Sequence, residues 1–334
     1  MATALTNPAQ FKAIADAIRA KTGETGTIVA NDFATKIAAI QTGVAKPGWV
    51  ANNNLANTKW SSICYGNGKF VAVAYSSNIA AYSTDGITWT RATLPASASW
   101  NSVCYGNGKF VAVAAGISYG AYSTNGVTWT KMTMPGSRNW NSVCYGDDKF
   151  VALCGMNNQL PAYSTDGINW SSGRLPVSSN WYSVCYGNGK FVAVTNGNNV
   201  AAYSTDGINW TQTTLPVVAY CTSVCYGDGK FVVVTGSGGY GRVLYSTNGA
   251  TWNATSLPAN VNWSSICYGN GKFVAVANGS NIAACGIGGI SWSKTTMPAS
   301  LVWSSVCYGD GKFVAVVSGS NANAYIKDYF ESWA

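Results

Sequence analysis

The side chains that usually perform acid–base catalysis are scarce in this sequence. The 334-residue chain contains no histidine, and residues 47–334 contain a single glutamate, Glu331. Glycoside hydrolysis normally needs a pair of carboxyl groups, or a tyrosine activated by a carboxylate. Most aspartates of residues 47–334 lie in repeated turn sequences, where aspartate favours the turn itself. From these residues we predict that the chain is not an enzyme.

Cysteine is the other reactive side chain, and its positions are regular. Seven of the ten cysteines occur in the triplet Cys-Tyr-Gly, 40 to 42 residues apart: Cys64, Cys104, Cys144, Cys185, Cys225, Cys267 and Cys307. Neighbouring sheets pack about 10 Å apart, whereas the Cα atoms of a disulfide lie within about 7 Å of each other. We therefore predict ten free thiols, with the seven repeated cysteines acting as small buried apolar side chains.

Neither a metal nor a cofactor is predicted. The chain has no histidine and no Cys-x-x-Cys pair, which removes the usual zinc ligand patterns. The segment GSGGYG at 236–241 fits a glycine-rich nucleotide-binding pattern. It lies between two predicted strands with no helix after it, so it lacks the structural context of a phosphate loop.

The cysteine triplet belongs to a longer repeat that predicts the fold. Residues 60–73 read WSSICYGNGKFVAV, and residues 100–113 read WNSVCYGNGKFVAV; a second segment, AYSTDGITW at 81–89, recurs with the same spacing. Each unit contains four candidate strands rich in Val, Tyr, Trp and Thr, with Asn-Gly or Asp-Gly pairs that suit tight hairpin turns. We number the units repeat 1 to repeat 7, in the order of their Cys-Tyr-Gly triplets. They predict an all-β fold, a seven-bladed β-propeller with four-stranded antiparallel blades.

The repeat also resembles known families. The stretch S-T-D-G-x-x-W resembles the Asp-box turn of sialidase-like propellers, with one residue fewer between Asp and Gly. The whole unit, which covers residues 49–334, is similar to propeller repeats common in bacteriophage and prophage proteins. The resembled sialidases hold the substrate carboxylate with three arginines. Here Arg91 and Arg174 fall on or near the predicted outer strands, badly placed for a central clamp, which again favours a protein without a catalytic site.

Residues 1–46 do not repeat and predict a small α-helical module, so the predicted domains are 1–46 and 47–334. Asn7-Pro8 suits a helix start, and Phe11, Ile14 and Ile18 then share one helical face. The stretch FKAIADAIRAKTG…DFATKIAAI resembles a short module of tail-associated phage and prophage proteins. That resemblance implies attachment to other virion or tail proteins, or to sister copies. The alternative is a plain helical cap on the propeller.

Closure of the ring has two competing solutions. Trp49 lies 11 residues before Trp60, the same spacing that separates Trp89 from Trp100. Residues 48–53 therefore resemble a fourth strand that completes the last unit, next to Tyr325. The chain end, ESWA, competes for the same place. We favour the N-terminal strand, because the last unit diverges just before its end.

Charge and targeting signals bear on partners and location. The net charge is +8, and a lysine follows the first hairpin of every repeat: Lys69, Lys109, Lys149, Lys190, Lys230, Lys272 and Lys312. Aspartates from the same turns share that face, and mixed signs argue against a phosphate track, so no nucleic-acid partner is predicted. No secretory signal or membrane-spanning stretch is visible. We predict a protein made in the bacterial host cytoplasm and located in the virion, without membrane insertion.

The two predicted faces of the ring differ. The hairpins between strands 1 and 2 and between strands 3 and 4 are nearly identical in every repeat, whereas the 2–3 and 4–1 loops vary, as binding loops on a scaffold do. The predicted ligand contacts in the varied loops are Tyr119, Asn157, Asn158, Asn198, Tyr220, Tyr240 and Arg242. Six tryptophans begin the innermost strands at the same face: Trp60, Trp100, Trp140, Trp181, Trp263 and Trp303. They either stack on a ligand or fill the wedge between blades.

These expectations together indicate a phage or prophage tail-associated protein of the receptor-binding type. The propeller would present its varied face to the host surface and bind a glycan there. Two alternatives stay open. One is a structural decoration or adaptor protein of the virion with no host ligand, and the other is a free lectin-like, carbohydrate-binding propeller.

Overall fold

The computed structural model describes residues 48–156, 158–236 and 241–327, together with Lys12, Ala15, Asp16 and Arg19. The chain divides into two compact units, Met1–Gly48 and Trp49–Ala334. In the first unit the four described residues have helical backbone, and Asp16 forms ion pairs with Lys12 and Arg19 at 2.7 and 2.6 Å. The predicted helical module of residues 1–46 otherwise lies outside the described residues.

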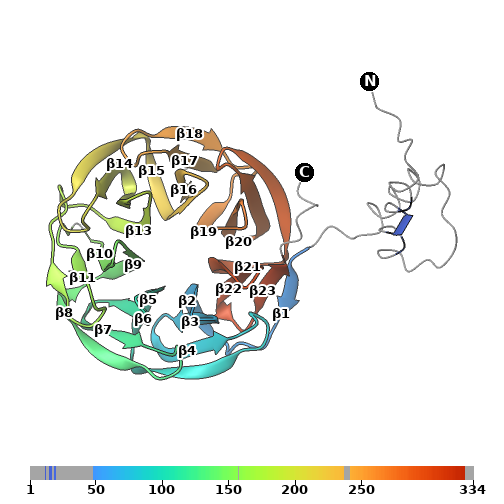
Figure 1. The fold of residues 1–334 in the computed structure, drawn as a ribbon, viewed down its shortest axis with the longest axis horizontal. Helices are drawn as coiled ribbons and strands as arrows, with labels where there is room; N and C mark the ends of the chain where they lie inside the picture. Colours follow the sequence, from blue (N-terminus) through green and yellow to red (C-terminus); the bar gives the residue numbers. More distant parts are fainter. Residues whose placement is uncertain are drawn as a thin grey trace. The chain divides into compact units, whose positions relative to one another are not determined.

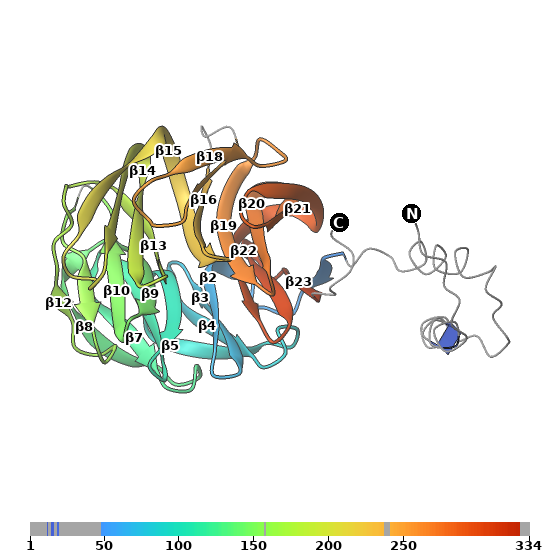
Figure 2. The ribbon, with the colours of Figure 1, turned by 45° about the horizontal axis from the view of Figure 1, so that its top comes forward.

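The second unit is all-β, as predicted, and its antiparallel sheets follow one another around a central axis (Figures 1 and 2). The strands of the described residues are β1 (Val50–Asn52), β2 (Thr58–Gly66), β3 (Lys69–Ala74), β4 (Ser77–Ser83), β5 (Thr90–Gly106), β6 (Lys109–Ala115), β7 (Ile117–Ser123), β8 (Thr130–Arg138), β9 (Trp140–Gly146), β10 (Lys149–Cys154), β11 (Ala162–Ser164), β12 (Ser171–Ser172), β13 (Trp181–Gly187), β14 (Lys190–Ser204), β15 (Thr211–Gly227), β16 (Lys230–Thr235), β17 (Arg242–Ser246), β18 (Asn253–Ser256), β19 (Asn262–Gly269), β20 (Lys272–Ile287), β21 (Ser291–Gly309), β22 (Lys312–Ser320) and β23 (Asn323–Lys327).

Strand pairing follows the chain order. In repeat 1, β2 pairs with β3, β3 with β4, and β4 with the first half of β5. The second half of β5 then becomes the innermost strand of repeat 2, where it pairs with β6. The long strands β15 and β21 join consecutive repeats in the same way.

The first hairpin of each repeat is a tight turn with positive backbone φ. In repeat 1 the turn residues are Asn67 (φ 47°) and Gly68 (φ 70°). Left-handed backbone at two consecutive residues is the requirement of the two-residue hairpin turn, and Asn-Gly meets it at low cost. The recurring Asn-Gly and Asp-Gly pairs therefore fix where β2 and its equivalents end.

The Cys-Tyr-Gly triplet is explained by contacts between neighbouring repeats. The glycine of each triplet lies against the tyrosine ring of the next triplet, and a Cβ at that glycine would lie within 2.1 Å of the ring. The pairs are Gly66–Tyr105, Gly106–Tyr145, Gly146–Tyr186, Gly187–Tyr226, Gly227–Tyr268, Gly269–Tyr308 and Gly309–Tyr65. The last pair joins repeat 7 to repeat 1. Only glycine leaves room for this ring, so the triplet recurs unchanged.

The hydrophobic core lies between neighbouring repeats. One buried cluster combines Val71 and Val73 of repeat 1 with Phe110 and Ala112 of repeat 2, all without exposed surface. The side chains of a strand alternate between its two faces, so each KFVAV strand contributes to the clusters on both sides. The core therefore forms only when successive repeats are in place.

The ring is closed by the strand that the sequence analysis favoured. β1 pairs antiparallel with β23, with Val50 opposite Tyr325, and Trp49 is buried in the cluster of the last repeat. Asn323 is fully buried, and the amide orientation that satisfies its neighbours places its nitrogen 3.1 Å from the Asn52 carbonyl and its oxygen 3.1 Å from the Trp89 indole nitrogen. The closure prediction is confirmed. The competing segment ESWA lies outside the described residues.

Candidate functional site

The innermost strands carry a closed ring of serine hydroxyls. The Oγ of each serine accepts the backbone N–H of the next repeat at 3.1–3.3 Å, and the ring closes from Ser305 to Ile63. We call these residues the serine ring: Ser62, Ser102, Ser142, Ser183, Ser223, Ser265 and Ser305. Within the described part of the chain, no acceptor is found for their hydroxyl protons. Each serine therefore keeps one O–H group able to donate.

The residue before the serine also caps the neighbouring strand in all repeats but one. In six repeats its side chain donates to the backbone carbonyl of the tryptophan that begins the next innermost strand, at 2.5–3.0 Å. These six residues, with Tyr182 of repeat 4, form what we call the capping position: Ser61, Asn101, Asn141, Tyr182, Thr222, Ser264 and Ser304. In repeat 4 the corresponding carbonyl belongs to Cys221, and Asn196 donates to it instead, at 3.3 Å.

Both rings border one central cavity of about 510 Å³. Its lining comes from the first residues of the innermost strands and from residues that follow the second strands, so it lies at the end of the ring that carries the varied loops. Every described residue that lines it is uncharged. The cavity therefore offers hydroxyl and amide groups, and it lacks the cationic side chains that usually bind phosphate or carboxylate.

Two tyrosines interrupt this polar lining. Tyr75 is 41% exposed and Tyr182 is 40% exposed, and both line the cavity. The sequence analysis missed them, although a signal was present. The capping position is small and polar in every other repeat, and the position of Tyr75 is Ala115 in repeat 2 and Asn196 in repeat 4.

The six predicted tryptophans have 0–1% exposed surface. Five of their indole nitrogens donate to the carbonyl four residues earlier, as Trp60 does to Ala56 at 3.0 Å. A ring without exposed surface offers no face for a ligand to stack on. Their placement therefore fits the packing alternative, and of the six it is Trp60 that borders the central cavity.

The other predicted contacts do not meet in one place. Tyr119 packs edge-on against Trp100 and carries the Lys131 ammonium 3.8 Å from its ring centre. Asn198 is held by Ser179 at 2.8 Å and by the Val200 amide at 2.9 Å. Asn158 accepts the Leu160 amide at 2.9 Å.

Two further predicted contacts lie in the varied loops outside the cavity. Tyr220 is 46% exposed, and Arg242 is half-buried at the start of β17. Neither borders the central cavity. Asn157 and Tyr240 lie outside the described residues.

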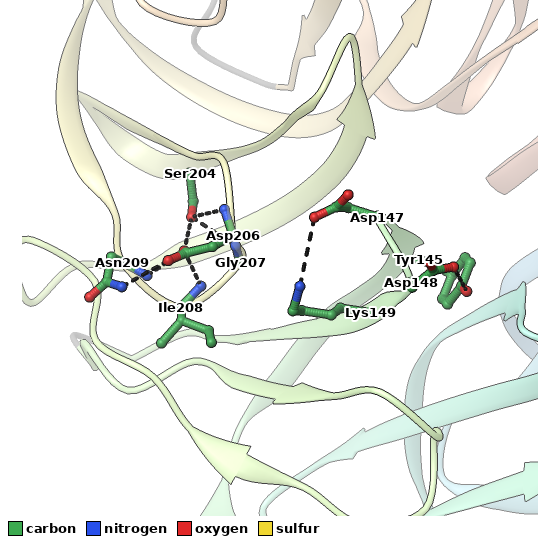
Figure 3. A network of polar contacts seen from close by, with 9 residues as sticks. All are labelled: Tyr145, Asp147, Asp148, Lys149, Ser204, Asp206, Gly207, Ile208 and Asn209. Atoms are coloured by element: carbon green, nitrogen blue, oxygen red, sulfur yellow. Dashed lines mark hydrogen bonds and ion pairs between the residues drawn. The ribbon is translucent and has the colours of Figure 1, made fainter.

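The aspartates of the uniform face are used to build turns (Figure 3). Asp206 accepts the backbone amides of Ile208 and Asn209 at 2.8 Å each, and the Ser204 hydroxyl donates to it at 2.9 Å. Burial alone would raise its pKa, but these hydrogen bonds outweigh burial and lower the pKa of Asp206 to about 2. In other hairpins of the repeats, the Lys149 ammonium lies 3.7 Å from the Asp147 carboxylate, and the Lys312 ammonium lies 2.7 Å from the Asp310 carboxylate. Mixed charges and hydrogen-bonded carboxylates are typical of a structural turn surface.

All ten cysteines are free thiols, which confirms that prediction. Burial raises the pKa of Cys154 to about 11 and that of Cys221 to about 12. Burial also raises the pKa of Cys104 far above its ordinary value, and the neighbouring Cys144 and Cys64 raise it further. Across the described ranges, no three His, Cys, Asp or Glu side chains gather closely enough to hold a metal ion.

No family model matches the sequence, and no curated protein is similar to it. Several solved structures share the fold. Virginiamycin B lyase from Staphylococcus aureus superposes with a TM-score of 0.75 at 14% identity, over 84% of this chain and 100% of that one. A streptogramin B lyase gives 0.74 at 15% identity, over 85% and 99%. YCF48 bound to a D1 peptide gives 0.68 at 14% identity, over 86% and 96%. These are β-propeller proteins, and the likeness confirms the propeller fold of this chain.

The comparison corrects the prediction that the chain is not an enzyme. Two of these neighbours are lyases, so proteins with this fold can be enzymes. One lyase structure is a catalytically inactive variant, with alanine in place of a histidine, solved with quinupristin. This chain contains no histidine. Identities of 14–15% show a shared fold and assign no reaction to this chain. Among the described residues, none belongs to a helix long and apolar enough to cross a membrane.

Proposed function

We propose that the chain is a recognition protein whose β-propeller has seven four-stranded blades and binds a surface glycan at the face of the 2–3 and 4–1 loops. The observation that carries the proposal is the uncharged central cavity at that face, with its hydroxyl and amide lining and two exposed tyrosines. Pockets of this kind, with few oriented polar groups beside aromatic surface, suit small neutral ligands.

The blade count is supported by the closed contacts between repeats. Seven Gly–Tyr pairs and seven serine–backbone hydrogen bonds each run once around the ring and return from repeat 7 to repeat 1. In repeat 1 the four strands of a blade would be the inner part of β2, then β3, β4 and the first half of β5. Repeat 7 would take its fourth strand from β1.

The biological setting is proposed from the sequence resemblance. A phage or prophage tail-associated protein would use residues 1–46 to attach to other virion proteins or to sister copies, and the propeller to contact the host surface. The protein would be made in the bacterial cytoplasm and carried in the virion. The two alternatives are an adaptor of the virion without a host ligand, and a free lectin-like propeller.

Two measurements separate these possibilities. Mass spectrometry of purified virions from the source strain asks whether the chain belongs to the particle. Binding of the fluorescently labelled full chain to intact bacterial cells asks whether it has a surface ligand. Presence in virions with cell binding supports the proposal, whereas presence without cell binding supports the adaptor. Cell binding by a chain that is absent from virions supports the free lectin.

Face assignment is tested with paired variants. Changing Tyr220 and Arg242 to Ala removes one exposed and one half-buried side chain of the varied face, while changing Lys69 and Lys109 to Ala removes side chains of the uniform face. Surface changes of this kind usually alter stability by less than about 0.5 kcal/mol. If only the lysine variant stops binding to cells, the ligand binds the uniform face and the proposal is wrong.

A further inference from the structure

Each innermost strand has one backbone N–H and one backbone carbonyl on its cavity side capped by a side chain of a neighbouring repeat. A strand at the edge of a sheet normally presents unpaired N–H and C=O groups that can bind an extended peptide. Here the Val103 N–H is taken by Ser62 at 3.1 Å, and the Trp100 carbonyl is taken by Ser61 at 2.6 Å. The equivalent groups of the other repeats are capped by the serine ring and the capping position, or by Asn196 in repeat 4. A peptide cannot add as a further strand without breaking these bonds.

The lining also argues against a charged ligand. None of the lining residues that the structure describes carries a charge, and the hydroxyl protons of the serine ring have no acceptor in the same part of the chain. Hydroxyl donors of this kind pair well with the hydroxyl and ring oxygens of a neutral ligand. A charged ligand would lose its hydration in this cavity without gaining an opposite charge.

The two cavity tyrosines supply flat apolar surface beside these donors. Tyr75 belongs to repeat 1 and Tyr182 to repeat 4 of the closed ring, so they border the cavity from different sides. Tyr182 occupies a capping position but is not needed as a cap, because Asn196 donates to the Cys221 carbonyl. The Tyr182 side chain therefore does not have to make the capping hydrogen bond that this position makes in the other repeats.

We propose that the central cavity is a binding site for a neutral saccharide, whose pyranose faces pack on Tyr75 and Tyr182 and whose hydroxyl groups accept from the serine ring. This inference rests on the proposed glycan-binding function and names its site and its ligand class. Under this proposal, Tyr75 and Tyr182 determine binding of the sugar. Tyr220 and Arg242, which lie outside the cavity, do not.

The repeats themselves provide matched variants for the test. Tyr182→Asn introduces the residue found at the capping position of repeats 2 and 3, and Tyr75→Ala introduces the residue of repeat 2. Both changes therefore place a side chain that the fold already accepts. The Tyr75→Phe and Tyr182→Phe variants keep the aromatic face. The Tyr220→Ala, Arg242→Ala double variant serves as a control outside the cavity.

The experiment is titration calorimetry of the full chain with cellohexaose, maltohexaose and chitohexaose as neutral probes, and with a hexasaccharide of galacturonic acid as an anionic probe. We expect one neutral probe to bind more tightly than the anionic one. The Tyr75→Ala, Tyr182→Asn variant should bind it at least about tenfold more weakly, as expected when desolvated contacts worth about 1.4 kcal/mol or more are lost. The Phe variants and the control outside the cavity should bind like the wild type.

The outcomes separate this inference from the proposed function. If sugar binding survives loss of both tyrosines but disappears in the Tyr220→Ala, Arg242→Ala variant, the cavity assignment is overturned and glycan recognition stands. Preferred binding of the anionic probe overturns the ligand class. If intact cells are bound but no neutral probe is, the saccharide inference fails alone. If neither cells nor sugars are bound, the proposed function fails with it.

Discussion

Replacing Trp49 by alanine should weaken the closure of the ring. Trp49 precedes β1, the three-residue strand that pairs with β23, and its side chain is only 7% exposed within the cluster of the last repeat. Its indole nitrogen has no hydrogen-bond partner. The substitution therefore removes packing without breaking a side-chain hydrogen bond, and the measured change reports burial alone.

The magnitude follows from the buried area. A buried tryptophan removes roughly 150–250 Å² from water, which at about 25 cal/mol per Å² corresponds to about 4–6 kcal/mol as an upper bound. Large-to-small substitutions of aromatic core residues cost about 3–5 kcal/mol in practice. For a unit of this size, each kcal/mol lowers the Tm by about 2 °C. We expect the Tm of Trp49→Ala to fall by about 6–10 °C.

The assay is thermal unfolding of the full chain followed by circular dichroism. Val50→Ala is the matched control, because Val50 lies in the same strand but is 47% exposed, so its loss should change the Tm by about 1 °C or less. Deletion of residues 1–53 should lower the Tm further, since it also removes the hydrogen bond from Asn52 to the Ile87 carbonyl and exposes the edge of β23. A Trp49→Ala protein that melts like the Val50→Ala protein would refute the reasoning.

Four other predictions follow from the contacts between repeats and within the turns. Gly187→Ala should cost at least about 1–3 kcal/mol, because its Cβ would lie 2.0 Å from the Tyr226 ring; an unchanged denaturant midpoint would contradict this. The folded-state pKa of Asp85 and of Asp206 is about 2, below the unfolded value of about 3.9, so each contributes stability that is fully present above pH 4 to 5 and is lost as the pH falls toward 2. Changing both to Asn, the residue that accepts the same amide bonds in repeats 2 and 5, should move acid unfolding to lower pH, as followed by circular dichroism. Asn196→Ala should destabilise the protein by about 1–3 kcal/mol by uncapping the Cys221 carbonyl, and Tyr182→Asn should restore part of this loss; additive effects in denaturant titration would contradict the coupling. Intact mass after denaturing alkylation without reduction should show ten added groups, and fewer would mean a disulfide.

Much of the fold was predictable because the same turn and strand sequences recur in successive repeats. The Asn-Gly pairs predicted the hairpins, and the Trp49 spacing predicted the closing strand that pairs with Tyr325. The reason for the Cys-Tyr-Gly triplet was not predictable from one repeat. Gly66 is required by Tyr105 of the next repeat, a contact across 39 positions that becomes visible only once the neighbouring strands are placed.

The candidate site was predictable only in part. The sequence located the varied face and the six tryptophans that begin the innermost strands there. It did not reveal that Asn196, from a different strand, would cap the Cys221 carbonyl and thereby release Tyr182. It also gave no means to tell buried rings from exposed ones, because the six tryptophans and Tyr182 are all aromatic side chains near the start of an innermost strand.

The way the repeats bind one another determines which positions can carry function. The glycine of each triplet and the serine ring each contact the next repeat, and a change at either position would weaken the contact between those two repeats. The capping position also contacts the next repeat, but a residue of another strand can make its hydrogen bond. In repeat 4, Asn196 donates to the Cys221 carbonyl in this way. Where another residue can make the capping hydrogen bond, the capping position can carry a ligand-binding side chain with little loss of stability. Tyr182 occupies such a position, and it lies at the cavity where the ring is otherwise uniform and uncharged.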